Sequence, residues 1–165
     1  MIAHAKPHAP LDVYATTVAR DWIDYNGHMN DAAYALVFSR SVDALMDRIG
    51  LDAAARKHTG QSLYTLQMML HYFREARVGE ALAVTCRLIE HDEKRMRIWL
   101  ELFDAKGERL AASEQLLLSV ALGEVGARAA PWTHETQAAL DALRKLHASM
   151  PHPVEAGAGV AMTRT

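Results

Sequence analysis

Apolar side chains recur every three or four positions through residues 31–49, and polar side chains fill most positions between them. The apolar positions are Tyr34, Val37, Phe38, Val42, Leu45 and Ile49, and Ser41 falls on the same face. This is the period of an α-helix with one buried face. Gly50 is a typical stop just beyond it. The pattern therefore predicts a long amphipathic helix over residues 31–49.

A period of two, typical of strands, dominates the stretch after this helix. We predict strands at 14–18, before the helix, and at 62–73, 81–91, 95–103 and 109–122, after it, and a second helix near 132–147. In strand 62–73 the alternation predicts one apolar face made of Tyr64, Leu66, Met68, Leu70 and Tyr72. In strand 95–103 it predicts that Met96, Ile98, Leu100 and Leu102 oppose Arg95, Arg97 and Glu101. One helix followed by several long strands favours an α+β fold with an antiparallel sheet packed on the helix.

The domain organisation follows from where this patterning starts and stops. Residues 1–11 are expected to be a flexible N-terminal tail, 12–122 the main domain, and 123–165 a C-terminal helix with an extended tail. A sheet that packs one face on a helix leaves its other face and an edge open. We therefore expect a second copy of the chain to cover this surface, in a homodimer or a dimer of dimers.

Composition excludes several classes of protein. The chain has 165 residues, half of them apolar, which suffices for one domain with a core. A net charge of −2 disfavours a nucleic-acid binder that relies on bulk charge. The single cysteine, Cys86, excludes an intrachain disulfide, and neither a membrane-spanning run nor a signal peptide is recognisable. We expect a cytoplasmic protein with no membrane or nucleic-acid partner.

The segment 24–31, DYNGHMND, places a carboxylate, an amide and an imidazole directly before the predicted helix. Asp24 has the chemistry of a general base or nucleophile, and Asn26 and His28 could position water or substrate. Backbone N–H groups near Asn30 and Asp31, in the first helical turn, are expected to stabilise a developing oxyanion. Gly27 would permit a tight turn or a close approach to the substrate. The alternative is structural: Asp24 as a turn residue, and Asn30 or Asp31 as a helix N-cap.

A family resemblance rests on two motifs. DYNGHMND followed by Tyr34 resembles the D-x-N-x-H-V-N-N-x-x-Y segment of hotdog-fold thioesterases, and MLHYFREARVGEALAV resembles the Y-x-R-E-x-x-x-G-D stretch that opens their third strand. The resemblance covers about residues 12–122 and implies the hotdog fold, a long helix wrapped by a curved antiparallel sheet. It implies hydrolysis of a short acyl-CoA thioester to the free acid and coenzyme A, at sites that lie between subunits. The alternatives are a non-catalytic acyl-CoA-binding hotdog module and a hotdog acyl-CoA dehydratase.

The resemblance also implies roles for individual residues. Asp24 matches the catalytic carboxylate of 4-hydroxybenzoyl-CoA thioesterases, and Asp24, Asn26, His28 and Glu75 match positions implicated in plant acyl-carrier-protein thioesterases. Glu75 could equally be a solvated charge. Coenzyme A would be part of the substrate, with no other cofactor. Its phosphates would meet basic side chains at strand ends, for which the candidates are Arg74, Arg77, Lys94, Arg95 and Arg97.

Within this family, DWIDYNGHMN and the His- and Pro-rich tail most resemble the betainyl-CoA thioesterases of carnitine breakdown, although Asp21 stands where they have Glu. A trimethylammonium group would be recognised by aromatic faces and nearby negative charge. The candidate aromatic residues are Trp22, Tyr25, Tyr34 and Tyr64, of which Tyr34 and Tyr64 could instead be core residues. Glu114 interrupts an apolar strand and could be a buried, paired carboxylate. The nine histidines form no recognisable metal-binding motif, so no metal is expected.

Overall fold

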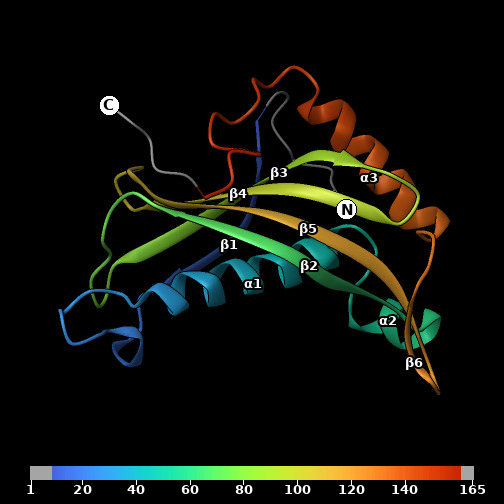
Figure 1. Ribbon diagram of the computed structural model, residues 1–165, viewed down its shortest axis with the longest axis horizontal. Coiled ribbons are helices and arrows are strands. Elements are labelled where there is room, and N and C mark those ends of the chain that lie inside the picture. The colour runs from blue at the N-terminus through green and yellow to red at the C-terminus, as the bar shows by residue number, and fades with distance from the viewer. Residues whose placement is uncertain (1–8, 161–165) are drawn as a thin grey trace.

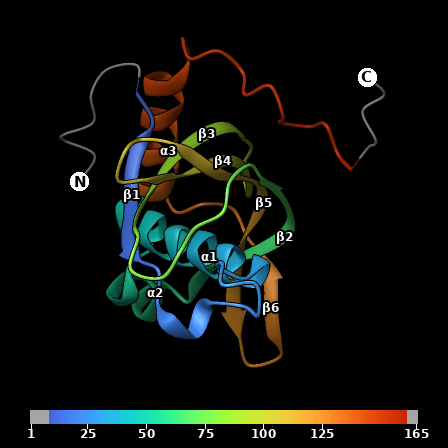
Figure 2. The same cartoon turned by 90° about the vertical axis from the view of Figure 1, so that its left-hand side faces the viewer.

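The structure, a computed structural model, describes residues 9–160, and its longest helix packs against an antiparallel sheet of six strands (Figure 1). The strands are β1 (Leu11–Thr17), β2 (Gln61–Tyr72), β3 (Ala81–His91), β4 (Arg95–Asp104), β5 (Arg109–Gly123) and β6 (Gly126–Ala129). The helices are α1 (Asp31–Arg48), α2 (Ala53–Thr59) and α3 (His134–His147), with a 3-10 turn at Arg20–Trp22. The sheet order is β1-β3-β4-β5-β2, with β6 paired to β5. The predicted α+β arrangement is confirmed, and Figure 2 shows the sheet curving around α1.

The core lies between α1 and the concave face of the sheet. Phe38 and Leu45 of α1 are fully buried, and β4 contributes the predicted row of Met96, Ile98, Leu100 and Leu102. Each such side chain stabilises the fold by about 1.5–3 kcal/mol through burial of apolar surface. This packing fixes the direction of α1 relative to the sheet, and so fixes where its N-terminus lies.

The prediction of one continuous apolar face on β2 was wrong. The register with β5 shifts between Thr65 and Gln67, which marks a bulge. A bulge adds one residue to the strand and moves the following side chains to the opposite face. Leu63 before the bulge and Leu70 after it both pack against the core, so Tyr64 points away from it.

Two elements escaped prediction because both are too short to show a period. Helix α2 is defined by its ends: the Asp52 side chain accepts a hydrogen bond from the Ala55 amide at 2.8 Å, and Gly60 ends the helix at φ 68°. A Cβ at Gly60 would also lie only 3.3 Å from the Leu122 carbonyl oxygen. Strand β6 forms within the predicted connector by pairing with the end of β5. The predicted flexible tail, 1–11, overlaps β1, whose first residue Leu11 is buried; residues 1–8 lie outside the described residues.

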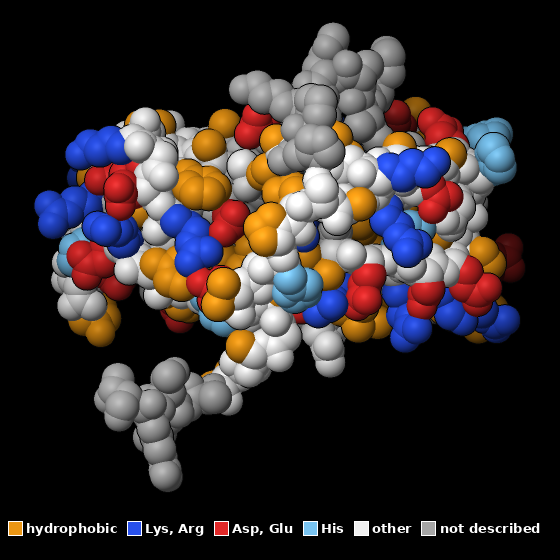
Figure 3. All heavy atoms as spheres, turned by 90° about the horizontal axis from the view of Figure 1, so that it is seen from above, with side chains coloured by type: hydrophobic (Ala, Val, Ile, Leu, Met, Phe, Trp, Pro, Cys, Tyr) orange, Lys and Arg blue, Asp and Glu red, His pale blue; other side chains and the backbone are white. Residues whose placement is uncertain are grey.

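Helix α3 and the segment after it extend over the part of β3 that β1 does not cover. The Leu88 amide donates to Nδ1 of His147 at 3.1 Å, which satisfies an edge donor that no strand pairs. Residues 148–160 then cross the outer face of the sheet, where Arg87 donates to the Met150 carbonyl at 2.7 Å and to that of Pro151. Figure 3, which views this side, shows basic and acidic side chains interspersed with hydrophobic ones. None of the helices in residues 9–160 is long and apolar enough to cross a membrane.

The buried His147 gives the fold a defined sensitivity to acid. Burial, then the nearby Arg87 charge, lowers the pKa of His147 to about 4 from its ordinary 6.5. Between pH 6.5 and about 4, His147 is protonated in the unfolded chain but not in the folded chain. The free energy of unfolding should therefore fall as the pH drops through this range, and level off below about pH 4. The loss from this residue is at most about 3 kcal/mol.

We expect His147→Asn to remove this part of the pH dependence, because Asn can still accept from the Leu88 amide but does not titrate in this range. Urea unfolding at pH 7, 6, 5 and 4 measures it. The exposed His134→Asn is the matched control and should keep the wild-type slope. An identical pH profile for His147→Asn and the wild type would contradict the assignment.

Candidate active site

The segment 24–28 is a tight loop with its own hydrogen bonds. Ile23 and Met29 form a β-bridge at its base. The Asp24 amide donates to the His28 carbonyl at 2.9 Å, and the Gly27 amide donates to the Asp24 carbonyl at 3.1 Å. Gly27 has a φ of 81°, and nothing lies within 4 Å of where a Cβ would sit. Glycine is therefore needed at position 27 for its backbone conformation and not for close packing within the chain. This agrees with the prediction of a tight turn.

Two backbone hydrogen bonds tie this loop to the body of the protein. The Met29 amide donates to the Ala76 carbonyl, and the Asn30 amide donates to the Trp22 carbonyl, both at 2.8 Å. Met29 and Ala76 are buried. The loop is thus held between the 3-10 turn and the chain that leaves β2, immediately before α1 begins.

A pocket of about 390 Å³ opens where this loop, the N-terminus of α1 and the end of β2 meet. Its lining includes all four predicted catalytic residues: Asp24, Asn26, His28 and Glu75. It also includes the predicted Asp31, Tyr34 and Arg74, and three residues that were not predicted, Met29, Tyr72 and Phe73. Tyr72 could have been found, since it is the tyrosine of the Y-x-R-E motif that contains Arg74 and Glu75.

The Asp24 carboxylate is held in place through one of its two oxygens. Its Oδ1 accepts from the Asn26 amide at 2.8 Å and more weakly from the His28 amide at 3.4 Å, the pattern of an Asx turn. Its Oδ2 accepts no hydrogen bond within residues 9–160. One oxygen therefore orients the group, and the other is available to a water molecule or a substrate.

His28 and Glu75 form a pair across the pocket. The Nε2 atom of His28 lies 2.9 Å from Oε2 of Glu75, which follows the end of β2. The His28 side chain is mostly buried, whereas that of Glu75 is largely exposed. Glu75 is therefore placed to orient the imidazole, which in turn lies on the same short loop as Asp24.

The expected oxyanion donors at the start of α1 reduce to one. The Asn30 amide, expected to be one of these donors, instead donates to the Trp22 carbonyl and so attaches the loop to the 3-10 turn. The Asn30 side chain caps the helix by accepting from the Ala32 amide at 2.9 Å. In the described part of the chain the Asp31 amide has no partner. It points from the positive end of the helix dipole, where negative charge is stabilised.

Three of the four predicted aromatic residues lie outside this pocket. Trp22 packs against the core, and the Arg40 guanidinium lies 5.6 Å from its ring centroid. Tyr25 is 97% exposed at the loop tip. Tyr64 pairs with Leu118 of β5, whereas Tyr72 pairs with Ala111, so the two tyrosines are about 23 Å apart along the strand. Tyr64 is far from the pocket because it lies near the opposite end of β2 from Tyr72, and the bulge, which periodicity does not reveal, turns it away from the core.

The predicted phosphate-binding residues also separate. Arg74 lines the pocket and lies 3.2 Å from Glu108, and the exposed Arg77 is close by in sequence, after β2. Lys94 and Arg95 lie at the β3–β4 turn, at the Tyr64 end of the sheet, and Arg95 pairs with Asp92 at 2.6 Å. Within one chain these two basic residues do not reach the pocket, because the hairpin carries them to the far end.

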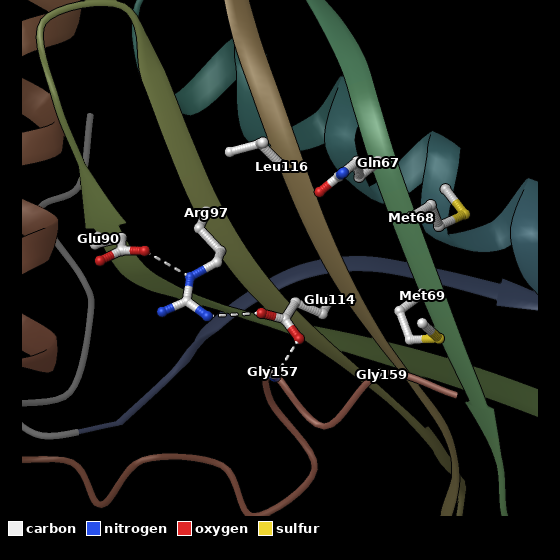
Figure 4. Close-up of a pocket in the computed structure, with 9 residues that line it drawn as sticks. All are labelled: Gln67, Met68, Met69, Glu90, Arg97, Glu114, Leu116, Gly157 and Gly159. Atoms are coloured by element: carbon white, nitrogen blue, oxygen red, sulfur yellow. Dashed lines mark hydrogen bonds and ion pairs between the residues drawn. The ribbon is translucent and has the colours of Figure 1, made fainter. Parts of the chain in front are cut away.

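A larger pocket, of about 750 Å³, lies on the opposite face of the sheet beneath the C-terminal segment (Figure 4). Here Arg97 pairs with both Glu90 and Glu114 at 2.8 Å, and Glu114 also accepts from the Gly157 amide at 2.6 Å. Glu114 is thus a paired, mostly buried carboxylate, as suggested from the sequence. Because Arg97 is paired with Glu90 and Glu114 on this face, it does not reach the 24–28 loop. None of the predicted catalytic residues lines this larger pocket.

Metal-ligating side chains do not gather in the described structure. Among residues 9–160, no group of three or more His, Cys, Asp or Glu side chains is arranged to hold a metal ion. The pocket at the 24–28 loop offers a carboxylate, an imidazole–carboxylate pair and a backbone donor, which is a set suited to proton transfer and oxyanion stabilisation.

Comparison with known proteins gives consistent results. Residues 18–140 match the model of the thioesterase-like superfamily. The chain is 43% identical over 148 residues to a betainyl-CoA thioesterase of Pseudomonas aeruginosa, a match that spans 89% of this chain and 92% of that protein.

Two solved structures resemble the chain along nearly all of its length. A Pseudomonas putida protein described as a thioesterase candidate is 38% identical, with a TM-score of 0.81 over 94% of this chain and 99% of that one. A Staphylococcus aureus protein solved in complex with CoA has a TM-score of 0.84 over 96% of this chain and all of that one, at 22% identity. The second likeness concerns the fold.

Proposed function

Since this chain belongs to the thioesterase-like superfamily, we propose that the pocket at its catalytic loop hydrolyses betainyl-CoA, with Asp24 as the base. The chain has the hotdog fold and hydrolyses an acyl-CoA thioester. This activity is favoured over the two alternatives, a non-catalytic acyl-CoA-binding module and an acyl-CoA dehydratase. The observation that carries the assignment of the site is the convergence of Asp24, His28, Glu75 and the start of α1 on one pocket.

The proposed reaction begins with water held near the free Oδ2 of Asp24. Asp24 removes a proton as the water oxygen attacks the thioester carbonyl carbon. The carbonyl oxygen becomes an oxyanion and accepts a hydrogen bond from the Asp31 amide, at the positive end of α1. The intermediate then expels the coenzyme A thiolate, which takes the proton from Asp24, leaving the free acid. Asn26 and the His28–Glu75 pair position the water and the acyl group.

No metal ion or cofactor is required in this proposal, because coenzyme A is part of the substrate and a thioester is already activated toward attack. Arg74 and Arg77 are the basic residues proposed to meet the phosphates of coenzyme A, since both follow β2 beside the pocket. A cytoplasmic location also stays a proposal. The single cysteine, Cys86, which excludes an intrachain disulfide, is consistent with it.

We further propose that the chain works as a homodimer joined along β2. This strand has twelve residues, ends the sheet, and leaves one side of its backbone without a strand partner in the described chain. Its exposed apolar side chains include Leu66, at 50% exposure, with Tyr64 and Met68 on either side. A long, apolar, uncovered edge is unfavourable in a monomer. Pairing two such edges would place the end of each β2, and hence each pocket, near the subunit boundary.

The first prediction concerns Asp24. Asp24→Asn should lower turnover of a betainyl-CoA substrate by about 100-fold or more, because a positioned base is lost. Asn can still accept from the loop amides, so the unfolding midpoint should be little changed. Near-normal turnover in a folded variant would refute the assignment. A single turnover in ¹⁸O-labelled water should label only the product acid; label on Asp24 would indicate attack by the carboxylate itself.

The second prediction concerns the substrate. A panel of acyl-CoA esters, followed with a thiol-detecting dye, should show release of free coenzyme A. We expect kcat/KM for betainyl-CoA to exceed that for the neutral isostere 3,3-dimethylbutanoyl-CoA by about 30-fold or more. This corresponds to about 2 kcal/mol of recognition of the cation. Equal values for the two esters would show that the pocket reads size alone, and the chain would then be a general short-acyl thioesterase.

The third prediction concerns assembly. Light scattering should give a mass of at least two chains, and Leu66→Lys should shift it toward one chain with loss of activity, because a charge at the paired edge is desolvated. Val154→Lys is the matched control, since Val154 is exposed and lines a cavity with Thr85 of β3 and Trp99 of β4, which β5 separates from β2. A fully active monomer at the assay concentration would contradict the proposed dimer.

A further inference from the structure

Most aromatic side chains near the catalytic loop are already engaged or turned away. The Arg109 guanidinium lies 4.2 Å from the ring centroid of Phe73, and Arg40 lies over Trp22. The Tyr25 ring is almost wholly exposed at the loop tip. Among the aromatic residues that line the pocket, this leaves Tyr34 from α1 and Tyr72 from the last position of β2.

Tyr34 and Tyr72 form a fixed corner. Their ring centroids are 5.3 Å apart and their planes are perpendicular. Each hydroxyl is tied to a backbone carbonyl: Tyr34 donates to Arg74 at 3.2 Å, and Tyr72 donates to Asp31 at 3.3 Å. Tyr34 is 3% exposed and forms the inner wall, whereas Tyr72 is 50% exposed and offers ring surface to the pocket. The two rings are therefore held in place before any ligand arrives.

The charges around this corner favour a cation. Three carboxylates, those of Asp24, Asp31 and Glu75, line the pocket. Against them stand Arg74, whose charge is shared with Glu108 at 3.2 Å, and His28, which faces Glu75. Asp31 is adjacent to Tyr72, whose hydroxyl donates a hydrogen bond to the Asp31 carbonyl. Burial of the Tyr72 hydroxyl, and secondly the Asp31 charge, raises the pKa of this group. An anionic acyl group would be repelled here.

A quaternary ammonium group has no N–H to donate and is recognised by aromatic faces with nearby negative charge. We propose that Tyr72 is the residue that selects this group: the trimethylammonium end of the acyl chain packs against Tyr72, Tyr34 forms the back of the site, and Asp31 supplies the negative charge. This rests on the proposed betainyl-CoA hydrolase and names the side chains that give it its specificity. Tyr72 acts on binding of the acyl group and takes no part in proton transfer.

Tyr72 is the residue to test, because it is half-exposed, whereas truncation of the buried Tyr34 would disturb the core. The measurement is kcat/KM for betainyl-CoA and for 3,3-dimethylbutanoyl-CoA. Tyr72→Leu should lower the ratio of the two values about 10-fold or more by weakening only the cationic ester. Tyr72→Phe should keep the ratio within about 3-fold of the wild type, because the aromatic face remains. Tyr25→Leu is the matched control and should leave the ratio unchanged, because it removes a ring that is almost wholly exposed at the loop tip and does not line the pocket.

A direct probe of the site is tetramethylammonium ion as an inhibitor of hydrolysis of the neutral ester. It should compete with that ester in the wild type and inhibit Tyr72→Leu and Asp31→Asn at least about 3-fold more weakly. Asp31→Asn leaves the Tyr72 ring in place, so it also tests the assignment if Tyr72→Leu fails to fold.

The outcomes separate the two proposals. A wild-type enzyme with no preference for the cationic ester would overturn both the substrate and this assignment. A wild-type preference that survives in Tyr72→Leu, or a loss that affects both esters equally, would overturn the role of Tyr72 and leave the betainyl-CoA proposal standing. A loss in Tyr72→Phe as large as in Tyr72→Leu would show that the hydroxyl, and not the ring face, is responsible.

Discussion

The hydrogen bond from the Met29 amide to the Ala76 carbonyl holds the whole site together. Both residues are buried, so this bond is shielded from water and its loss would leave unpaired backbone groups in the interior. It joins two segments that are almost fifty residues apart in sequence: the loop that carries Asp24 and His28, and the chain that carries Arg74 and Glu75 after β2. The 2.9 Å approach of His28 to Glu75 follows from this attachment.

The helix contributes through its position more than through its side chains. Burial of Phe38 and Leu45 in the concave sheet fixes the axis of α1 and therefore the point in space where its first turn begins. Of the amides in that turn, those of Asn30 and Ala32 are consumed by the attachment of the loop and by the N-cap. The Asp31 amide remains. Within residues 9–160 the Asp31 amide is thus the donor of this turn that has no partner, and it is the one proposed to stabilise the oxyanion.

The two faces of the sheet contact different parts of the chain. Helix α1 packs on the concave face, and the 24–28 loop lies at one end of it. The outer face binds the C-terminal segment through an ion pair, Arg109 with Glu155 at 2.6 Å, and through a hydrogen bond that the Gly157 amide donates to Glu114. Trp99, on this outer side of β4, is buried although it lies outside the core, and the segment around Pro151 and Glu155 lines the same cavity. The pocket on this face is the larger one, but the proposed catalytic residues Asp24, His28 and Glu75 line the pocket at the 24–28 loop instead.

The sequence alone determined the elements whose signal is local. The 3.6-residue period gave α1, and the two-residue period gave the strands that follow and the buried row of β4. The polar segment before the helix indicated Asp24, Asn26 and His28 as candidates, and the family resemblance added Glu75. The structure places all four at one pocket.

Only the tertiary structure decided what depends on pairing between distant segments. The β2 bulge is a matter of register with β5, and it decides that Tyr64 faces away from the core. The hairpin places Lys94 and Arg95 at the far end of the sheet, and the use of the Asn30 amide depends on where Trp22 folds back. Tyr72 of β2 contacts Tyr34 of α1 because packing of the helix on the sheet brings these distant segments together. Periodicity describes one segment at a time, whereas a site is made of the segments that packing brings together.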